Sequence, residues 1–220
     1  MRTLKLTKET IQNILTDLLK RSPNNYTQYE SSVNEIIANV RSNGDQAVFD
    51  YTQKFDGATV TADNIEVTED EIAEAYELVD QKLLEVIRKA KENIRVYHEK
   101  QKQYSWFDSS IPGTMLGQKV TPIAKAGVYV PGGKAVYPSS VLMNIMPAKV
   151  AGVEEIIMTT PCNKAGKVNP STLVAAKEAG ADRVFKVGGA QAIAALAFGT
   201  ESIPRVNKIV GPGNIYVALA

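Results

Sequence analysis

The sequence predicts an α/β protein in which a parallel sheet carries helices on both faces, preceded by a mostly helical N-terminal region. From residue 122 onward, short apolar strands alternate with helical stretches, and the connections between them are short. Glycine-rich turns follow three of these strands, at 131–133, 188–189 and 211–213. Because the carboxyl ends of parallel strands meet at one edge of a sheet, we expect the three turns to lie together.

The N-terminal stretches carry apolar residues at the spacing of amphipathic helices. In the first, Ile11 and Leu15 belong to an apolar stripe behind Thr7, a candidate cap, and this helix is predicted to run to about Arg21. Two shorter helices follow. One is predicted to end at Asn43-Gly44, and the other to run from Asp45 to Asp56-Gly57.

A longer helical stretch follows a brief strand predicted near Ile65 to Val67. Thr68 and Glu71 have the spacing of a capping box, in which each side chain bonds the backbone of the other residue. The apolar periodicity predicts a helix from there to about Gln103, with Asp80 as a candidate break.

The second half begins with a linker or a small β ribbon and continues as alternating strands and helices. The ribbon or linker is predicted over 106–122, where Pro112-Gly113 marks a turn. A helix beginning at Pro170, capped by Asn169 and closed by Gly180, has the most complete end signals. The other predicted segments are strands 128–130, 155–160, 183–187 and 208–210, and helices 139–151, 190–198 and from 214.

Composition excludes several classes of function. The net charge of +1, with basic and acidic residues interleaved, gives no field that would recruit nucleic acid or an anionic membrane. The first residues form no apolar signal segment, and no apolar stretch approaches the ~20 residues that cross a bilayer. A single cysteine suits a reducing compartment. We therefore expect a cytoplasmic protein that binds neither nucleic acid nor membrane.

The single histidine and single cysteine also limit the chemistry. His98 lies on a charge-rich helix, where a solvated or surface-packed side chain is the simplest interpretation. Cys162 follows a strand and a proline, and without a second histidine to act as its base we interpret it as an ordinary thiol. Since zinc prefers histidine and cysteine ligands, a catalytic zinc site made from this chain alone is not expected.

The glycine turns suggest a small-molecule site. Glycine lets the backbone approach a ligand closely, and the free N–H groups at the start of the next helix favour negative charge, typically phosphate. A single turn of this kind is weak support, but three converging turns are stronger. None of them fits the dinucleotide fingerprint, because Gly211-x-Gly213 lacks its third glycine and Gly188-Gly189 has the wrong spacing.

Five longer motifs, taken together, identify a family. The segments 129–133, 137–144, 147–153, 188–195 and 211–217 resemble histidinol dehydrogenases in order and spacing, and the likeness extends over all 220 residues. The resemblance implies a Rossmann-like sheet similar to that of aldehyde dehydrogenases. It also implies the NAD-dependent oxidation of L-histidinol through the aldehyde to L-histidine, with zinc orienting the substrate, in a homodimer.

Carried over residue by residue, the family's NAD contacts fall on Tyr129, Gln191 and Asn214. Each is a polar side chain beside an open turn, suited to ribose hydroxyls and phosphate. Ser139, with Ser140, is a candidate for the substrate pocket, and an N-cap serine is the alternative interpretation. The family's zinc ligands and catalytic base lie beyond the point matching Ala220, so no catalytic or metal-binding residue is assigned in this chain.

The resemblance also implies a division into domains. Residues 1–24 are expected to form a helical arm, 25–121 a helical region with a small β ribbon that belongs to a domain completed downstream, and 122–220 the Rossmann-like NAD-binding domain. The final residues are the start of an apolar helix with no end signal, which suggests the front part of a longer protein, inactive by itself. Two other interpretations remain: an α/β module that binds a nucleotide or phosphate ligand without catalysis, and an interaction protein that uses the helix of residues 69–103.

Overall fold

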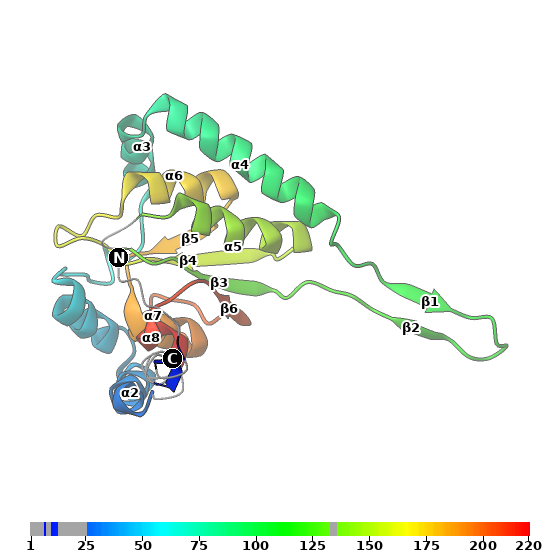
Figure 1. Ribbon diagram of the computed structural model, residues 1–220, viewed down its shortest axis with the longest axis horizontal. Helices are drawn as coiled ribbons and strands as arrows, with labels where there is room; N and C mark the ends of the chain where they lie inside the picture. The colour runs from blue at the N-terminus through cyan, green and yellow to red at the C-terminus, as the bar shows by residue number, and fades with distance from the viewer. Residues whose placement is uncertain (1–6, 8–9, 13–25, 133–135) are drawn as a thin grey trace.

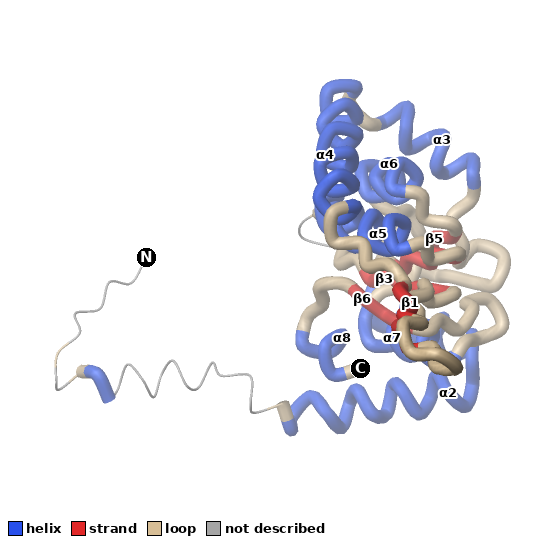
Figure 2. The backbone as a smooth tube through the Cα atoms, turned by 90° about the vertical axis from the view of Figure 1, so that its right-hand side faces the viewer, coloured by secondary structure: helices blue, strands red, loops and turns tan. Residues whose placement is uncertain are grey.

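The protein has a central sheet between two layers of helices (Figures 1 and 2). The structure is a computed structural model that describes residues 7, 10–12, 26–132 and 136–220. Most of the helix predicted from Thr7 to about Arg21 lies outside these residues. In chain order the elements are α2 (Thr27–Asp56), α3 (Glu69–Leu78), α4 (Gln81–Glu99), β1 (Trp106–Asp108), β2 (Leu116–Gln118), β3 (Lys125–Tyr129), α5 (Pro138–Ala151), β4 (Glu155–Thr159), α6 (Pro170–Ala179), β5 (Arg183–Phe185), α7 (Gly189–Phe198), β6 (Lys208–Val210) and α8 (Ile215–Leu219).

The four strands of the sheet are parallel and lie in the order β5-β4-β3-β6. The chain passes from β3 through α5 to β4 and through α6 to β5, always in the same direction across the sheet. It then crosses the opposite face through α7, so that β6 pairs with the free side of β3. The strand order therefore reverses between β3 and β6, and in open α/β sheets ligands bind at such a reversal.

Alternating side chains of the strands build one apolar core on each face. Val128 and Ile156 join α4, α5 and α6 on one side, and Tyr129 and Ile157 join α2 and α7 on the other. This alternation is the period of two expected for a strand that is covered on both faces. The fold class predicted from the sequence, a parallel sheet with helices on both faces, is confirmed.

Helix α2 consists of two helical segments joined at Gly44. This residue has φ 52° and ψ −131°, which no other part of the helix adopts, and a side chain there would meet the carboxylate of Glu201. That carboxylate accepts the N–H of Asp45 at 2.8 Å and so caps the second segment. The predicted break at Asn43-Gly44 is confirmed, although the two segments remain in one continuous element.

The two helices that follow begin where their capping residues predict. Both hydrogen bonds of the capping box between Thr68 and Glu71 are present, and Asp80 caps α4, which confirms the break there. Helix α4 ends at Glu99, short of the predicted Gln103, because apolar periodicity does not define a helix end to within a turn.

The strands and helices of the second half agree with the predicted segments to within about a turn. The strand β3 begins earlier than predicted, at Lys125, and β5 ends earlier, at Phe185. Pro170 and Gly180 occupy the two ends of α6 as expected. The brief strand predicted near Ile65 to Val67 is a single antiparallel bridge between Glu66 and Phe185.

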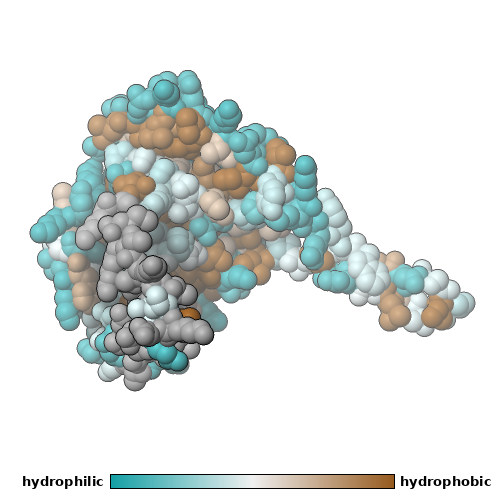
Figure 3. All heavy atoms as spheres, viewed as in Figure 1, coloured by the Kyte–Doolittle hydropathy of each residue, from teal (hydrophilic) through white to brown (hydrophobic). Residues whose placement is uncertain are grey.

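Strands β1 and β2 form an antiparallel hairpin that projects from the body of the molecule (Figure 1). Of the two interpretations of 106–122, the small β ribbon is therefore the one observed. Large apolar or aromatic side chains are exposed along it, namely Trp106, Phe107, Ile111, Met115 and Leu116. Figure 3 shows hydrophobic residues near its far end. None of the described helices combines the length and the apolar character that a membrane span requires.

A buried ion pair ties α3 to the sheet. The Lys186 ammonium group, on a side chain only 7% exposed, lies 2.7 Å from Glu71 Oε2. The same carboxylate oxygen accepts the N–H of Thr68 in the capping box, so Glu71 serves the helix start and the lysine together. Because Lys186 follows β5 directly, this pair fixes the helical layer at the carboxyl edge of the sheet.

We expect Glu71→Ala to lower the free energy of unfolding by about 3–5 kcal/mol, because it leaves the Lys186 ammonium buried without a partner. Glu74→Ala is the matched control. The Glu74 side chain is 54% exposed and pairs with Lys167 at the surface, so its loss should cost about 1 kcal/mol or less. Urea unfolding followed by circular dichroism measures both, and equal losses in the two variants would contradict the buried pair's role.

Candidate functional site

A pocket of about 500 Å³ lies at the carboxyl edge of the sheet, next to the reversal of strand order. Tyr129, Gln191 and Asn214, each predicted from a different turn, all line it. Gly132 and Gly189 contribute backbone from two of the turns, whereas Gly133 lies outside the described residues. The structure thus brings the three predicted residues together in one pocket, as the parallel strand order predicts.

Tyr129 connects the end of β3 to the start of α7. Its side chain is 4% exposed, and its hydroxyl oxygen accepts the N–H of Gly189 at 3.3 Å. Burial raises the pKa of Tyr129 above the usual value of 10, so the hydroxyl keeps its proton at neutral pH. That proton is available for donation to a ligand, because the oxygen acts only as an acceptor toward Gly189.

Gln191 is the third residue of α7 and the most unusual polar side chain at the site. It is 1% exposed, yet among the described residues neither its amide oxygen nor its amide nitrogen has a hydrogen-bond partner. Gly189 has a φ of 66°, and a Cβ there would lie 2.6 Å from Gln191 Oε1, so glycine is needed for the amide to fit. A buried amide without partners costs free energy, which a ligand with both a donor and an acceptor would recover.

The start of α7 adds a site for negative charge. The helix begins at Gly189 with no side-chain cap and no acidic residue in its first turn. The N–H of Gly189 is donated to Tyr129, but the N–H groups that follow it and the positive end of the helix dipole favour an anion. Together with the unpartnered Gln191 amide, this favours a ligand that carries phosphate beside hydrogen-bonding groups.

Asn214 has a structural role and a free donor. Its Oδ1 accepts the N–H groups of Tyr216 at 3.0 Å and Val217 at 3.2 Å, so the side chain caps α8. The amide N–H groups make no hydrogen bond among the described residues and can serve a ligand. Asn214 can therefore donate to a ligand, while its oxygen is already occupied.

Sequence reasoning missed the contribution of α2 to this pocket. Four residues from the last turns of α2 also line it, namely Tyr51, Lys54, Phe55 and Asp56. The one available signal was Asp56, an acidic residue at the end of a helix, where the dipole disfavours negative charge. In the sequence, Asp56-Gly57 indicates only a helix stop.

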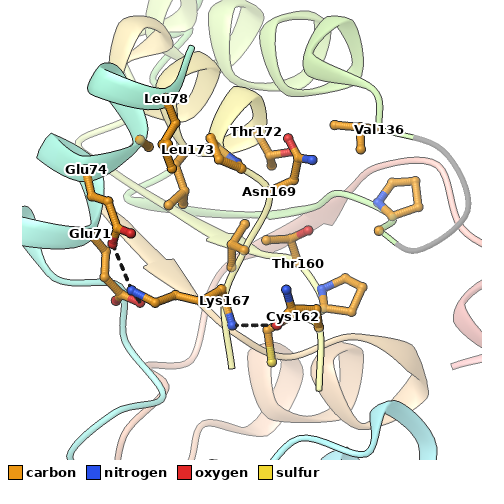
Figure 4. A pocket seen from close by; sticks show the side chains of 17 residues that line it. Glu71, Glu74, Leu78, Val136, Thr160, Cys162, Lys167, Asn169, Thr172 and Leu173 are labelled. Atoms are coloured by element: carbon orange, nitrogen blue, oxygen red, sulfur yellow. Dashed lines mark hydrogen bonds and ion pairs between the residues drawn. The ribbon is translucent and has the colours of Figure 1, made fainter. Parts of the chain in front are cut away.

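A second pocket, of about 320 Å³, lies between α3 and α6 and shares Gly132 and Pro161 with the first (Figure 4). Its charged side chains are paired, since Lys167 contacts Glu74 at 2.9 Å. Cys162 also lines it. Burial raises the pKa of the Cys162 thiol, which makes it a poor nucleophile and supports the interpretation as an ordinary thiol. The first pocket is therefore the better candidate for ligand binding.

The other candidate residues lie apart from the first pocket. His98 is half-buried on α4, with Nδ1 2.7 Å from Gln101 Oε1. Ser139 is exposed in the first turn of α5 and lines neither the first nor the second pocket. Its interpretation as an N-cap is wrong, because Tyr137 occupies the cap position and Pro138 the first helical one. Within the part of the chain that the structure describes, no three His, Cys, Asp or Glu side chains are grouped as a metal site.

The parallel sheet with a polar pocket at its reversal point defines a Rossmann-like α/β protein. Comparison with known proteins is more specific. The family model for histidinol dehydrogenase matches residues 19–220. The histidinol dehydrogenase of Bacillus subtilis (strain 168) is 59% identical over 203 residues, which cover 92% of this chain and 47% of that protein. That of Aquifex aeolicus (strain VF5) is 55% identical, over 92% of this chain and 46% of that protein.

A solved structure agrees with the sequence comparison. The crystal structure of histidinol dehydrogenase from Elizabethkingia anophelis superimposes with a TM-score of 0.80 at 35% identity, covering 100% of this chain and 46% of that one. The chain belongs to the histidinol dehydrogenase family. It spans about half the length of the curated relatives that it matches.

We expect Gln191→Leu to raise the free energy of unfolding by about 1–3 kcal/mol, because it removes a buried amide that has no partner. The two residues have similar helix propensity and size, so little else changes. Gln81→Leu, at an exposed position near the start of α4, is the control and should change stability by about 0.5 kcal/mol or less. A large loss of stability in Gln191→Leu would show that the fold itself uses the amide.

Proposed function

We propose that this chain supplies the NAD-binding part of a histidinol dehydrogenase, which oxidises L-histidinol through the aldehyde to L-histidine. The observation that carries the proposal is the unpartnered, buried amide of Gln191 in a pocket shared with Tyr129 and Asn214. NAD, when bound, would accept hydride from the substrate. The name of the relatives supports histidinol as that substrate.

The chain's own groups suit the parts of a dinucleotide. The start of α7 would hold the pyrophosphate, since its N–H groups and dipole favour anions. The Gln191 amide would both donate and accept, and the Tyr129 hydroxyl and the Asn214 amide nitrogen would donate. The aromatic rings of Tyr51 and Phe55, stacked with centroids 5.6 Å apart, border the same pocket and offer it apolar surface.

Zinc does not fit the residues that the structure describes. Among the described residues no cluster of histidine, cysteine and carboxylate side chains could hold it. We propose that the zinc ligands, the catalytic acid–base residues and most substrate contacts belong to the half of the relatives that this chain does not match. The proposed substrate contact of Ser139 would then depend on that half, because Ser139 is exposed and lies outside the first pocket.

The remaining features of the full-length enzyme are also proposals. We propose the domain limits 1–24, 25–121 and 122–220, a cytoplasmic location and a homodimer. The interpretation as an interaction protein is less favoured, because one face of the helical stretch it would use already packs against the body of the protein. Leu84 and Ile87 of α4 are buried against α5 and α6.

We expect the 220-residue chain to bind NAD without forming NADH when histidinol and zinc are added. Calorimetric titration measures binding, and absorbance of the reduced cofactor measures turnover. Binding is expected because Tyr129, Gln191 and Asn214 share one pocket, and inactivity because the chain lacks a metal cluster among its described residues. A binding module without catalysis would also bind NAD without forming NADH. Turnover by a full-length version therefore separates the dehydrogenase from the binding module. Histidinol-dependent NADH from the 220-residue chain would contradict the assignment of the catalytic groups to the unmatched half.

A further inference from the structure

Asp56 is the last residue of α2 and lines the same pocket as Tyr129 and Gln191. Its Oδ2 atom is buried and has no hydrogen-bond partner among the described residues. The pocket therefore contains two side chains whose polar atoms the protein leaves unpaired, an amide from α7 and a carboxylate from α2. The resemblance to the family assigned no role to Asp56.

The fold does not explain this carboxylate. The end of α2 is closed by Gly57, which has a φ of 69° and donates its N–H to Gln53 O at 3.1 Å, so the cap needs no side chain from Asp56. A negative charge at the C-terminal end of a helix is opposed by the helix dipole. Burial opposes it as well and raises the pKa of Asp56. An acidic residue that is disfavoured in two ways and holds no structural bond points to a ligand.

The surroundings of Asp56 do not neutralise it. Lys54 lines the same pocket, but its ammonium group lies over the rings of Phe55 and Tyr51, 5.5 and 6.0 Å from their centroids. No ion pair joins Lys54 and Asp56 in the described part of the chain. Tyr129 is neutral, and Glu35, the other carboxylate that lines the pocket, is exposed. Asp56 Oδ2 is thus a buried carboxylate oxygen that no described cation neutralises.

The start of α7 and the end of α2 favour different chemical groups of a ligand. The start of α7 favours an anion, whereas Asp56 at the end of α2 favours a group that donates hydrogen bonds. A nucleotide carries both, as phosphate and as ribose hydroxyls. Dinucleotide sites of this sheet type commonly hold a ribose with a carboxylate that follows the second strand. Here that strand, β4, is followed by Thr160, Pro161 and Cys162, none of which is acidic.

We propose that the Asp56 carboxylate accepts hydrogen bonds from the adjacent hydroxyls of a ribose of the dinucleotide, replacing the carboxylate that is missing after β4. The proposal rests on the proposed function, since it needs NAD to occupy this pocket. It adds a residue from the helical lead-in to a site otherwise made by the edge of the sheet.

The test compares Asp56→Asn with the unchanged chain, using NAD and inorganic pyrophosphate as separate probes. Asp50→Asn is the matched control, because it removes one negative charge from an exposed position on the same helix, outside the pocket. Asp56→Asn should weaken NAD binding roughly tenfold or more, as expected for the loss of hydrogen bonds to a charged acceptor. Pyrophosphate, which has no hydroxyl groups to donate, should bind as well as before or more tightly.

Stability provides the second measurement. Asp56→Asn and Asp56→Leu should leave the melting temperature of the free chain unchanged or raised, because the fold holds no bond to this carboxylate. A fall in stability would assign Asp56 a structural role and overturn the proposal. NAD binding that is equal in Asp56→Asn and the unchanged chain would also overturn it while leaving the proposed function intact. If the unchanged chain binds no NAD, the proposed function fails first and the role of Asp56 fails with it.

Discussion

The reversal of strand order between β3 and β6 is the constraint on which the rest of this molecule depends. Because β6 pairs with the free side of β3, its connecting helix α7 must cross the face opposite to α5 and α6. That helix exposes an apolar side that α2 then covers, through residues such as Val33, Val40 and Leu196. The reversal also leaves a crevice at the sheet edge, where the turns after β3, β5 and β6 meet.

The polar groups around this crevice fall into two sets. One set is paired within the protein, as Glu71 is with Lys186 and Asn214 Oδ1 is with the start of α8, and it stabilises the fold. The other set consists of the Gln191 amide and the Oδ2 atom of Asp56, which are buried without hydrogen-bond partners among the described residues. Proteins retain such groups at functional sites even though replacing them would make the protein more stable. The division between the two sets is the physical basis for placing the ligand in the first pocket.

The sequence predicted the sheet well because local signals define its elements. Asn169, Pro170 and Gly180 mark both ends of α6, and apolar strands with glycine turns define the rest. Since parallel order brings the turns to one edge, the sharing of one pocket by Tyr129, Gln191 and Asn214 followed without any tertiary information. The contribution of α2 did not follow. Its residues lie far from the glycine turns in sequence, and no local pattern indicates that a helix end will pack over a distant strand edge.

The sequence alone also could not predict which single polar atoms are buried. The resemblance to the family assigns Gln191 to NAD, but only the structure shows that its amide has no partner among the described residues. In the sequence, Asp56 indicates the end of a helix, and nothing in the sequence indicates that its Oδ2 atom is buried without a partner. Ser139 shows the opposite error, since a serine near a helix start suggested a cap that Tyr137 and Pro138 already define.

We propose that the chain binds NAD in the pocket formed by Tyr129, Gln191 and Asn214. The most direct measurement is a titration of the 15N-labelled 220-residue chain with NAD, following backbone and side-chain amide resonances by NMR. We expect saturable shifts at Gly189, at the side-chain amide of Gln191 and at Asn214. Shifts confined to Lys167, Asn169 and the other residues of the second pocket, with Gln191 unchanged, would contradict it.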